Sequence, residues 1–344
     1  MTDRAVASPP RESEWELLPA DFMAHNRRDF LGGSDAAAVL GLSPFATPVQ
    51  LWQIKRGIWA PKISRHRQKM FDRGHKLEPF IREMVIDRLT YDYGLSVELV
   101  ECNARYHDPE FPWMSCEIDF ELRITGVAVI NGEEVIFDDE LVNADAKSVT
   151  GFARKKWGEV DTEDVPIEYA VQFMFGLMVT PGRRKRCLVA ALRSFDDVDI
   201  YWTVRDDETI AAMRPKLVRF WTEHVLTGIP PDPMVFSDIK ALFPLDNGLA
   251  IEATPEIAGK VAQLRDIKAQ IKVYEEAEEA LKYEIGDYIS PNARLTYLGK
   301  DIATFRGQAR TGFDLDGLRE ADPDAYAIFS TTTTSRVLRL PKKG

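Results

Sequence analysis

The most constraining feature of this sequence is the order in which helical and β-type hydrophobic patterns follow each other between residues 33 and 228. Segments with helical spacing come first. Short β-rich segments follow, and one apolar helical segment interrupts them. The helical segments are residues 48–57, 71–89, 165–180 and 207–228, and the β-rich ones are residues 96–107, 113–124, 133–149, 184–194 and 198–204. This order predicts an α/β or α+β fold in which helices flank a mixed β-sheet.

The segment "IPPDP", residues 229–233, predicts the end of this main domain. Beyond it, residues 264–288 repeat apolar side chains at alternating steps of three and four, with one polar break, which is a heptad seam. Such a seam predicts a coiled-coil arm or an oligomer contact, and a long helix packed on its own domain explains it equally well. We expect a flexible N-terminus over 1–20, the main domain over 21–235, and a helical and small β appendage over 236–344.

Charge is unevenly distributed along a chain whose net charge is −11. Residues 55–76 hold eight basic residues and a single acid, whereas acidic residues concentrate at 133–145 and 275–284. This segregation suits an enzyme with a polyanion-binding groove and an acidic metal centre. A solvated surface segment accounts for the basic run equally well. If the groove exists, we expect Lys62, Arg65 and Lys69 to contact the backbone of a nucleic acid.

The cysteines and the apolar segments indicate where the chain works. The cysteines are Cys102, Cys116 and Cys187, an odd and scattered set that suits a reducing cytosol and supplies no C-x-x-C pair for zinc. The longest apolar run, residues 169–179, is about half the roughly 20 residues that a membrane helix needs. The N-terminus lacks an apolar signal core. These features predict a cytoplasmic protein without a membrane segment.

The motif "ADAKS" ends the β-rich segment 133–149 and offers a chemical site. Side chains two apart on a strand share a face, so Asp145 and Lys147 would lie together. A carboxylate there can ligate Mg²⁺, and the lysine can stabilise charge on a phosphate or help orient and deprotonate water. Asp119, 26 residues upstream on the preceding strand, is the natural second ligand. Alone, Asp-x-Lys is more often a surface ion pair.

The surrounding motifs resemble those of a known nuclease family. The string "RRDFLGGSDAAAVLGLSPFATPVQLWQIKRG" resembles the N-terminal motif of YqaJ-type viral recombinases, which belong with phage lambda exonuclease among the PD-(D/E)XK nucleases. The strings "RGHKLEPFI", "MSCEIDFEL", "ADAKSV" and "VPIEYAVQFMFGLMVTPG" follow in the order of that family. The resemblance covers residues 25–235 well and implies a restriction-endonuclease-like core with a mixed sheet.

The resemblance also implies a role for each matching residue. Asp119, Asp145 and Glu78 would bind Mg²⁺ or Mn²⁺, while Lys147, Glu78 and Gln172 would serve catalysis. Arg28 and Ser34 would hold a 5′-terminal phosphate, and the start of the helix after Gly32-Gly33 favours an anion as well. The chain departs from the family at two places: Asp145 stands where Glu is usual, and Glu117-Ile118-Asp119-Phe120 stands where Ser/Pro-Asp-Gly is usual.

Simpler explanations exist for several of these residues. Glu78 could pair with Arg82 on its helix surface, and Gln172 could be a buried amide satisfied by the backbone. Arg28 could be one more surface arginine. Asp35 is expected to cap a helix whatever the function.

Together these features predict a Mg²⁺-dependent deoxyribonuclease, and the resemblance implies an exonuclease that digests linear double-stranded DNA from 5′ to 3′. By resemblance, it would act in phage-type recombination within a bacterial host, pass 3′ single strands to an annealing protein, and assemble as a ring trimer. Two alternatives remain open: an endonuclease or nickase with the same metal centre, and a non-catalytic DNA-binding module for recombination.

Overall fold

The computed structural model describes residues 27–149, 153–180, 182, 184–192, 197–332 and 334–341. The flexible segment predicted over residues 1–20 therefore lies outside the described residues. The chain divides into two compact units, Met1–Leu242 and Phe243–Gly344. The predicted domain boundary after residue 235 stays a prediction. Among the described residues, no helix combines the length and the apolar composition needed to cross a membrane.

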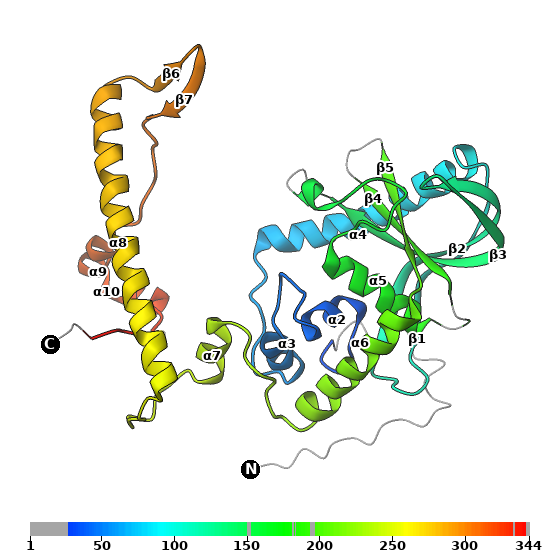
Figure 1. Ribbon diagram of the computed structural model, residues 1–344, viewed down its shortest axis with the longest axis horizontal. Coiled ribbons are helices and arrows are strands. Elements are labelled where there is room, and N and C mark those ends of the chain that lie inside the picture. Colours follow the sequence, from blue (N-terminus) through cyan, green and yellow to red (C-terminus); the bar gives the residue numbers. More distant parts are fainter. Residues whose placement is uncertain are drawn as a thin grey trace. The chain divides into compact units, whose positions relative to one another are not determined.

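A five-stranded mixed sheet forms the centre of the first unit (Figure 1). Its strands, in spatial order, are β1 (Ser96–His107), β2 (Ser115–Ile130), β3 (Glu133–Ser148), β4 (Arg186–Leu192) and β5 (Val198–Val204). Neighbouring strands are antiparallel except β3 and β4, which are parallel. A parallel pair needs a crossover connection, and α5 (Ile167–Val179) supplies it. The predicted mixed sheet flanked by helices is confirmed.

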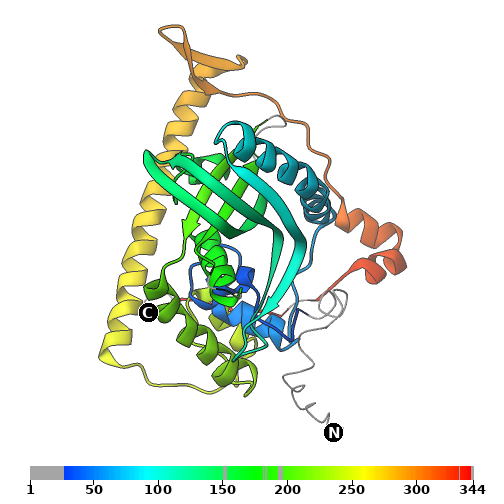
Figure 2. The same ribbon diagram turned by 90° about the vertical axis from the view of Figure 1, so that its right-hand side faces the viewer.

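Helices cover both faces of this sheet and create two hydrophobic cores (Figure 2). One core lies under α5, α2 (Gly33–Val39), α3 (Pro48–Lys55) and α6 (Asp207–Arg219), which continues as a π-helical segment, Phe220–Val225. The other core lies under α4 (Arg65–Tyr91). A 3-10 turn, Ala153–Lys156, and α7 (Phe236–Leu242) complete the elements of this unit.

Only the second half of α4 packs on the sheet. Ile81, Val85 and Leu89 recur every four residues, so they lie on one face and are fully buried. The first half carries the basic residues, and residues 65–73 are all exposed. Helix α4 begins earlier than the predicted residue 71, because Ser64 caps it by accepting the amide of Arg67 at 3.2 Å.

The caps of α2 and α3 position the segment that precedes the sheet. Helix α3 has the predicted capping box, in which Thr47 accepts the Gln50 amide and Gln50 accepts the Thr47 amide. The prediction that Asp35 is an N-cap is wrong, because Gly32 holds that position. Asp35 lies three residues later and its carboxylate accepts the Gly32 amide at 3.0 Å. The helix start therefore already holds an internal anion.

The second unit is built on one long helix, α8 (Pro255–Ile289), as Figure 1 shows. A two-stranded sheet follows, with β6 (Arg294–Tyr297) antiparallel to β7 (Lys300–Thr304), and then come α9 (Leu315–Ala321) and α10 (Pro323–Phe329). The long C-terminal helix and small β unit predicted from the sequence are confirmed. Helix α8 buries only Ile289, and its heptad seam is largely exposed.

Candidate active site

Asp145 and Lys147 lie near the C-terminal end of β3, on the sheet face that α5 covers. Their register partners on β4 are Val189 and Ala191, which belong to the core beneath α5. The ammonium of Lys147 forms an ion pair with Oδ1 of Asp145, and both side chains are mostly shielded from solvent. The motif therefore forms a shielded pair in a core, whereas a surface Asp-x-Lys pair would be solvated.

Asp119 joins this pair from β2. The antiparallel pairing of β2 and β3 ends at Phe120 and Ala144, so Asp119 lies one residue beyond the last paired position. Its Oδ2 accepts the backbone amide of Ala146 at 2.7 Å. Because Ala146 lies between Asp145 and Lys147, this bond holds the Asp119 carboxylate beside both of them.

The three charged groups perturb one another strongly. Burial, reinforced by the nearby Asp145 charge, raises the pKa of Asp119 to about 7. Burial lowers the pKa of Lys147, but Asp145 and Asp119 outweigh that effect, and its pKa is raised overall. Lys147 is therefore a firmly protonated ammonium, while the two carboxylates repel each other.

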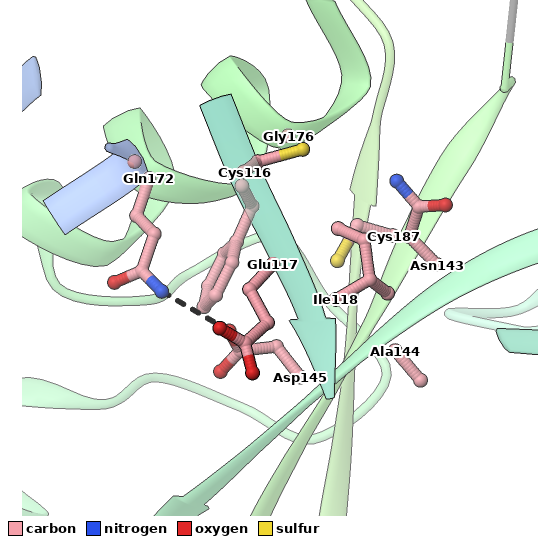
Figure 3. Close-up of a pocket in the computed structure, with 11 residues that line it drawn as sticks. Cys116, Glu117, Ile118, Asn143, Ala144, Asp145, Gln172, Gly176 and Cys187 are labelled. Carbon is pink, nitrogen blue, oxygen red and sulfur yellow. Dashed lines mark hydrogen bonds between the residues drawn. The ribbon is translucent and has the colours of Figure 1, made fainter. Parts of the chain in front are cut away.

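Helix α5 contributes three side chains to this site. The Nε2 amide of Gln172 donates to Oδ2 of Asp145 at 3.1 Å, which Figure 3 shows as a bond from α5 to the carboxylate. The rings of Tyr169 and Phe173 lie 5.4 Å and 5.8 Å from the Lys147 nitrogen, within cation–π range. The sequence pointed to Gln172 but not to the rings, although Tyr169 lies three residues before Gln172 and Phe173 four residues after Tyr169, which are the spacings of helical neighbours.

Glu78 faces the same region across a large cavity of about 470 Å³, and its charge contributes to the raised pKa of Asp119. Lining residues from α2, α4, β1, β2 and α5 include Ser34, Glu78, Arg105, Asp119 and Gln172. Glu78 contacts Nδ1 of His75 at 3.0 Å. The alternative that Glu78 pairs with Arg82 is not seen, because Arg82 donates to Sγ of Cys102.

A smaller cavity of about 40 Å³ lies behind Asp145, and Figure 3 shows its lining. Cys116 and Cys187 lie against it, and burial raises the pKa of both thiols. Protonated, buried thiols are poor nucleophiles. The cysteines in this region therefore pack the site and do not act in it.

Comparison with known proteins finds a family model that matches part of the chain. Residues 24–183 match the family model of the YqaJ-like viral recombinase domain. We call residues 24–183 the YqaJ-like domain after this similarity. The chain is 26% identical over 309 residues to the uncharacterized protein YqaJ of Bacillus subtilis (strain 168), and the match covers 87% of each chain.

Solved structures of an alkaline exonuclease resemble this chain more distantly. The crystal structure of LHK-Exo from Laribacter hongkongensis matches with 18% identity and a TM-score of 0.40, over 63% of this chain and 94% of the exonuclease. The structure of LHK-Exo in complex with dAMP matches with 18% identity and a TM-score of 0.37, over 64% and 96%.

The start of the YqaJ-like domain differs from the expected phosphate site. Arg27, not Arg28, lines the large cavity, and its Nη2 donates to Oγ of Ser34 at 2.8 Å. The guanidinium of Arg28 instead lies against Gly57, at the end of α3. The structure therefore brings Ser34 to the cavity with Arg27, and the role of Arg28 stays a prediction.

The basic segment of the YqaJ-like domain separates into exposed and buried residues. Lys62, Arg65 and Lys69 are exposed, and all three stay predicted DNA contacts. Lys55 is not available to DNA, because it is buried and its ammonium donates to the carbonyls of Arg27 and Phe30 and to Asp35. Burial lowers the pKa of Lys55, and the negative charge of Asp35 offsets part of this lowering.

The carboxylates of the YqaJ-like domain suit a hard divalent cation. In the part of the chain that the structure describes, His, Cys, Asp and Glu side chains form no ready cluster of three around a metal position. Mg²⁺ does not require one, since it often binds through one or two carboxylates and keeps several waters. Oδ1 of Asp145 is buried and, apart from its ion pair with Lys147, has no donor among the described groups. Above pH 7 Asp119 is ionised as well, because its pKa is about 7, and two carboxylates beside one ammonium then leave negative charge that a cation would neutralise.

Proposed function

We propose that this chain is a Mg²⁺- or Mn²⁺-dependent deoxyribonuclease that digests linear double-stranded DNA from the 5′ end. The observation that carries the proposal is the convergence of Asp119, Asp145 and Lys147 where β2 and β3 separate. Two carboxylates beside one ammonium, at the edge of a large polar cavity, suit hydrolysis of a phosphodiester. The 5′ polarity rests on the resemblance to the lambda exonuclease family.

The chain's own acidic residues account for cation binding. Asp119 and Asp145 would hold the ion, and Glu78 lines the same cavity as Asp119. Bound there, a divalent cation supplies positive charge that polarises the phosphate and makes water more acidic. Gln172 fixes the orientation of the Asp145 carboxylate by donating to its Oδ2.

Lys147 supports catalysis as a charge, not as a base. Its raised pKa keeps the ammonium protonated, so it cannot accept a proton from water. A protonated lysine beside the reacting phosphate stabilises the negative charge that develops on the phosphate oxygens. Of the two roles that the sequence left open for Lys147, charge stabilisation is the one we propose.

The polar cavity next to this site suits a nucleic-acid strand. Arg27 and Ser34 supply donors at its wall, and the exposed residues Lys62, Arg65 and Lys69 lie before and along the first turns of α4. We propose that these residues bind phosphates without reading sequence. By family resemblance, the 3′ strand would pass to an annealing protein in a bacterial cytoplasm, and three chains would form a ring.

Digestion of end-labelled duplexes tests this function. With Mg²⁺, the full-length protein should release labelled 5′ nucleotides from linear duplex, leave closed circular duplex intact, and lose activity in EDTA. Cutting of the closed circle would indicate an endonuclease or nickase. Binding without degradation, under all metal conditions, would indicate a DNA-binding module.

A further inference from the structure

Arg105 lies in the wall of the large cavity, close to Asp119. On β1, Cys102 and Ala104 pair with Phe120 and Ile118, so Asn103 lies opposite Asp119. Asn103 has a left-handed backbone, with φ of 55°, and the pair Arg105–Glu117 follows directly. Side chains two apart on a strand share a face. Arg105 therefore projects to the same side of β1 as Asn103. The residues Asn103, Arg105, Glu117 and Asp119 all line the cavity.

The guanidinium of Arg105 is only partly engaged. Its Nε and Nη2 donate to a single oxygen of Glu117, at 3.0 Å and 2.8 Å. Its Nη1 is buried and has no partner among the described groups. A guanidinium presents its donors as a rigid fork that matches phosphate oxygens. One nitrogen of this guanidinium therefore has no partner among the described groups, and the arginine itself lines the cavity that also holds Asp119.

Glu117 is a weak counter-ion for this arginine. Its side chain is 45% exposed, and such half-solvated ion pairs contribute little to stability. A phosphate carries full negative charge and several acceptor oxygens, so it competes well for the same fork. Glu117 is also two residues from Asp119 on β2 and adds a negative charge to the cavity.

We propose that Arg105 binds a phosphate group of the nucleic-acid strand, and that Glu117 is a counter-ion which this phosphate displaces. The proposal rests on the proposed nuclease function and adds a positioning residue and a built-in competitor to that site. The phosphate could be a terminal monoester or an internal diester, because both offer the same oxygens.

DNA binding in EDTA tests the proposal, because no cleavage is needed. The full-length wild type, Arg105→Gln, Glu117→Gln and the double variant would be titrated with duplexes that bear 5′-phosphate or 5′-hydroxyl ends. We expect Arg105→Gln to weaken binding about tenfold. Glu117→Gln should strengthen binding, and that gain should be smaller in the double variant, because part of the gain comes from releasing Arg105 and only the rest comes from removing the repulsion between Glu117 and phosphate.

The two kinds of end distinguish the source of the phosphate. Loss confined to the 5′-phosphate duplex indicates a terminal monoester, while equal loss on both indicates an internal diester. Arg123→Gln is the matched control, because Arg123 is also an ion-paired arginine but lies on β2 outside the cavity lining. This variant should bind both duplexes as tightly as the wild type does. The proposal is overturned if Arg105→Gln binds both duplexes as the wild type does, or if the gain from Glu117→Gln is as large without Arg105 as with it. Either result leaves the nuclease assay with Lys147 unaffected.

Discussion

The carboxylate of Asp119 on β2 accepts the backbone amide of Ala146 on β3, at 2.7 Å. This bond forms just beyond the last paired residues of the two strands. It holds a second acid beside Asp145 and Lys147, although 27 positions of sequence separate the two bonded residues. The site therefore depends on the point at which β2 and β3 stop pairing, as well as on the Asp-x-Lys motif.

Asp119→Asn should stabilise the metal-free protein at alkaline pH. In the folded protein Asp119 has a pKa of about 7, above its ordinary value of 3.8, so ionising it opposes folding. Because an asparagine cannot ionise and can still accept the Ala146 amide, we expect unfolding in EDTA at pH 8 to cost about 1–2 kcal/mol more than in the wild type. Urea denaturation measures the difference.

The pH dependence of this gain checks its cause. The penalty of the ionised carboxylate is complete above pH 7, shrinks as the pH falls, and is absent below about pH 4. The advantage of Asp119→Asn should follow the same course. Glu101→Gln, at an exposed position on β1, should show no such trend. Equal stability of Asp119→Asn and wild type at pH 8 would mean that the two carboxylates do not repel each other as described.

Tyr169 and Phe173 should position the ammonium of Lys147 through their ring faces. We expect Tyr169→Leu or Phe173→Leu to lower kcat about three- to tenfold with little change in KM, because a cation–π contact is worth about 1 kcal/mol. Tyr169→Phe keeps the ring and should retain activity near the wild-type level. If Tyr169→Phe is as slow as Tyr169→Leu, the hydroxyl matters and the ring-face explanation is wrong.

Neutral substitutions at Lys62, Arg65 and Lys69 should flatten the salt dependence of DNA binding. Each phosphate contact that is lost lowers the slope of log K against log salt by about 0.9 on duplex DNA. Equilibrium titrations at several salt concentrations measure the slope. A variant that replaces Lys260, Lys268 and Lys272, three exposed lysines of α8, provides the control. An unchanged slope in the first variant would remove its residues from the DNA interface.

Lys55→Met should destabilise the protein, although Lys55 belongs to the same basic segment. The buried ammonium satisfies two carbonyls and Asp35, so its removal leaves a buried carboxylate without its partner. Removing one partner of a buried ion pair lowers the free energy of unfolding by about 3 kcal/mol. Thermal unfolding should show a clearly lower Tm for Lys55→Met, whereas Lys62→Met, at an exposed site, should unfold like the wild type. A wild-type Tm for Lys55→Met would contradict the structural role.

Local pattern was enough to predict most elements of the fold. The alternation in "SVELVECNARYH" gave the bounds of β1, and the Thr47-Pro48-Gln50 sequence predicted the capping box of α3, because both depend on near neighbours. The same local geometry placed Asp145 and Lys147 on one face. Strand β2 continues to Ile130, beyond its predicted end, because its hairpin with β3 extends the pairing.

Long-range packing decided what the sequence could not show. Lys55 and Lys62 look alike in the basic segment, and only the positions of Asp35 and two carbonyls reveal that one of them is buried. Likewise, Arg27 and Arg28 are adjacent, but only Arg27 reaches Ser34. Arg105 carried no motif, and its place in the cavity follows from its pairing with Glu117.

The most direct test compares wild type and Lys147→Ala on end-labelled linear duplex DNA with Mg²⁺. DNA binding, measured in EDTA, should be retained by both proteins, because the ammonium is paired inside the site and is not part of the exposed basic surface. The wild type should degrade the DNA, and the degradation rate should be at least about a hundredfold lower with Lys147→Ala. Removing one donor that stabilises the charge of a transition state lowers the rate by this much. Degradation by Lys147→Ala at the wild-type rate would contradict the proposal that Asp119, Asp145 and Lys147 form the catalytic centre.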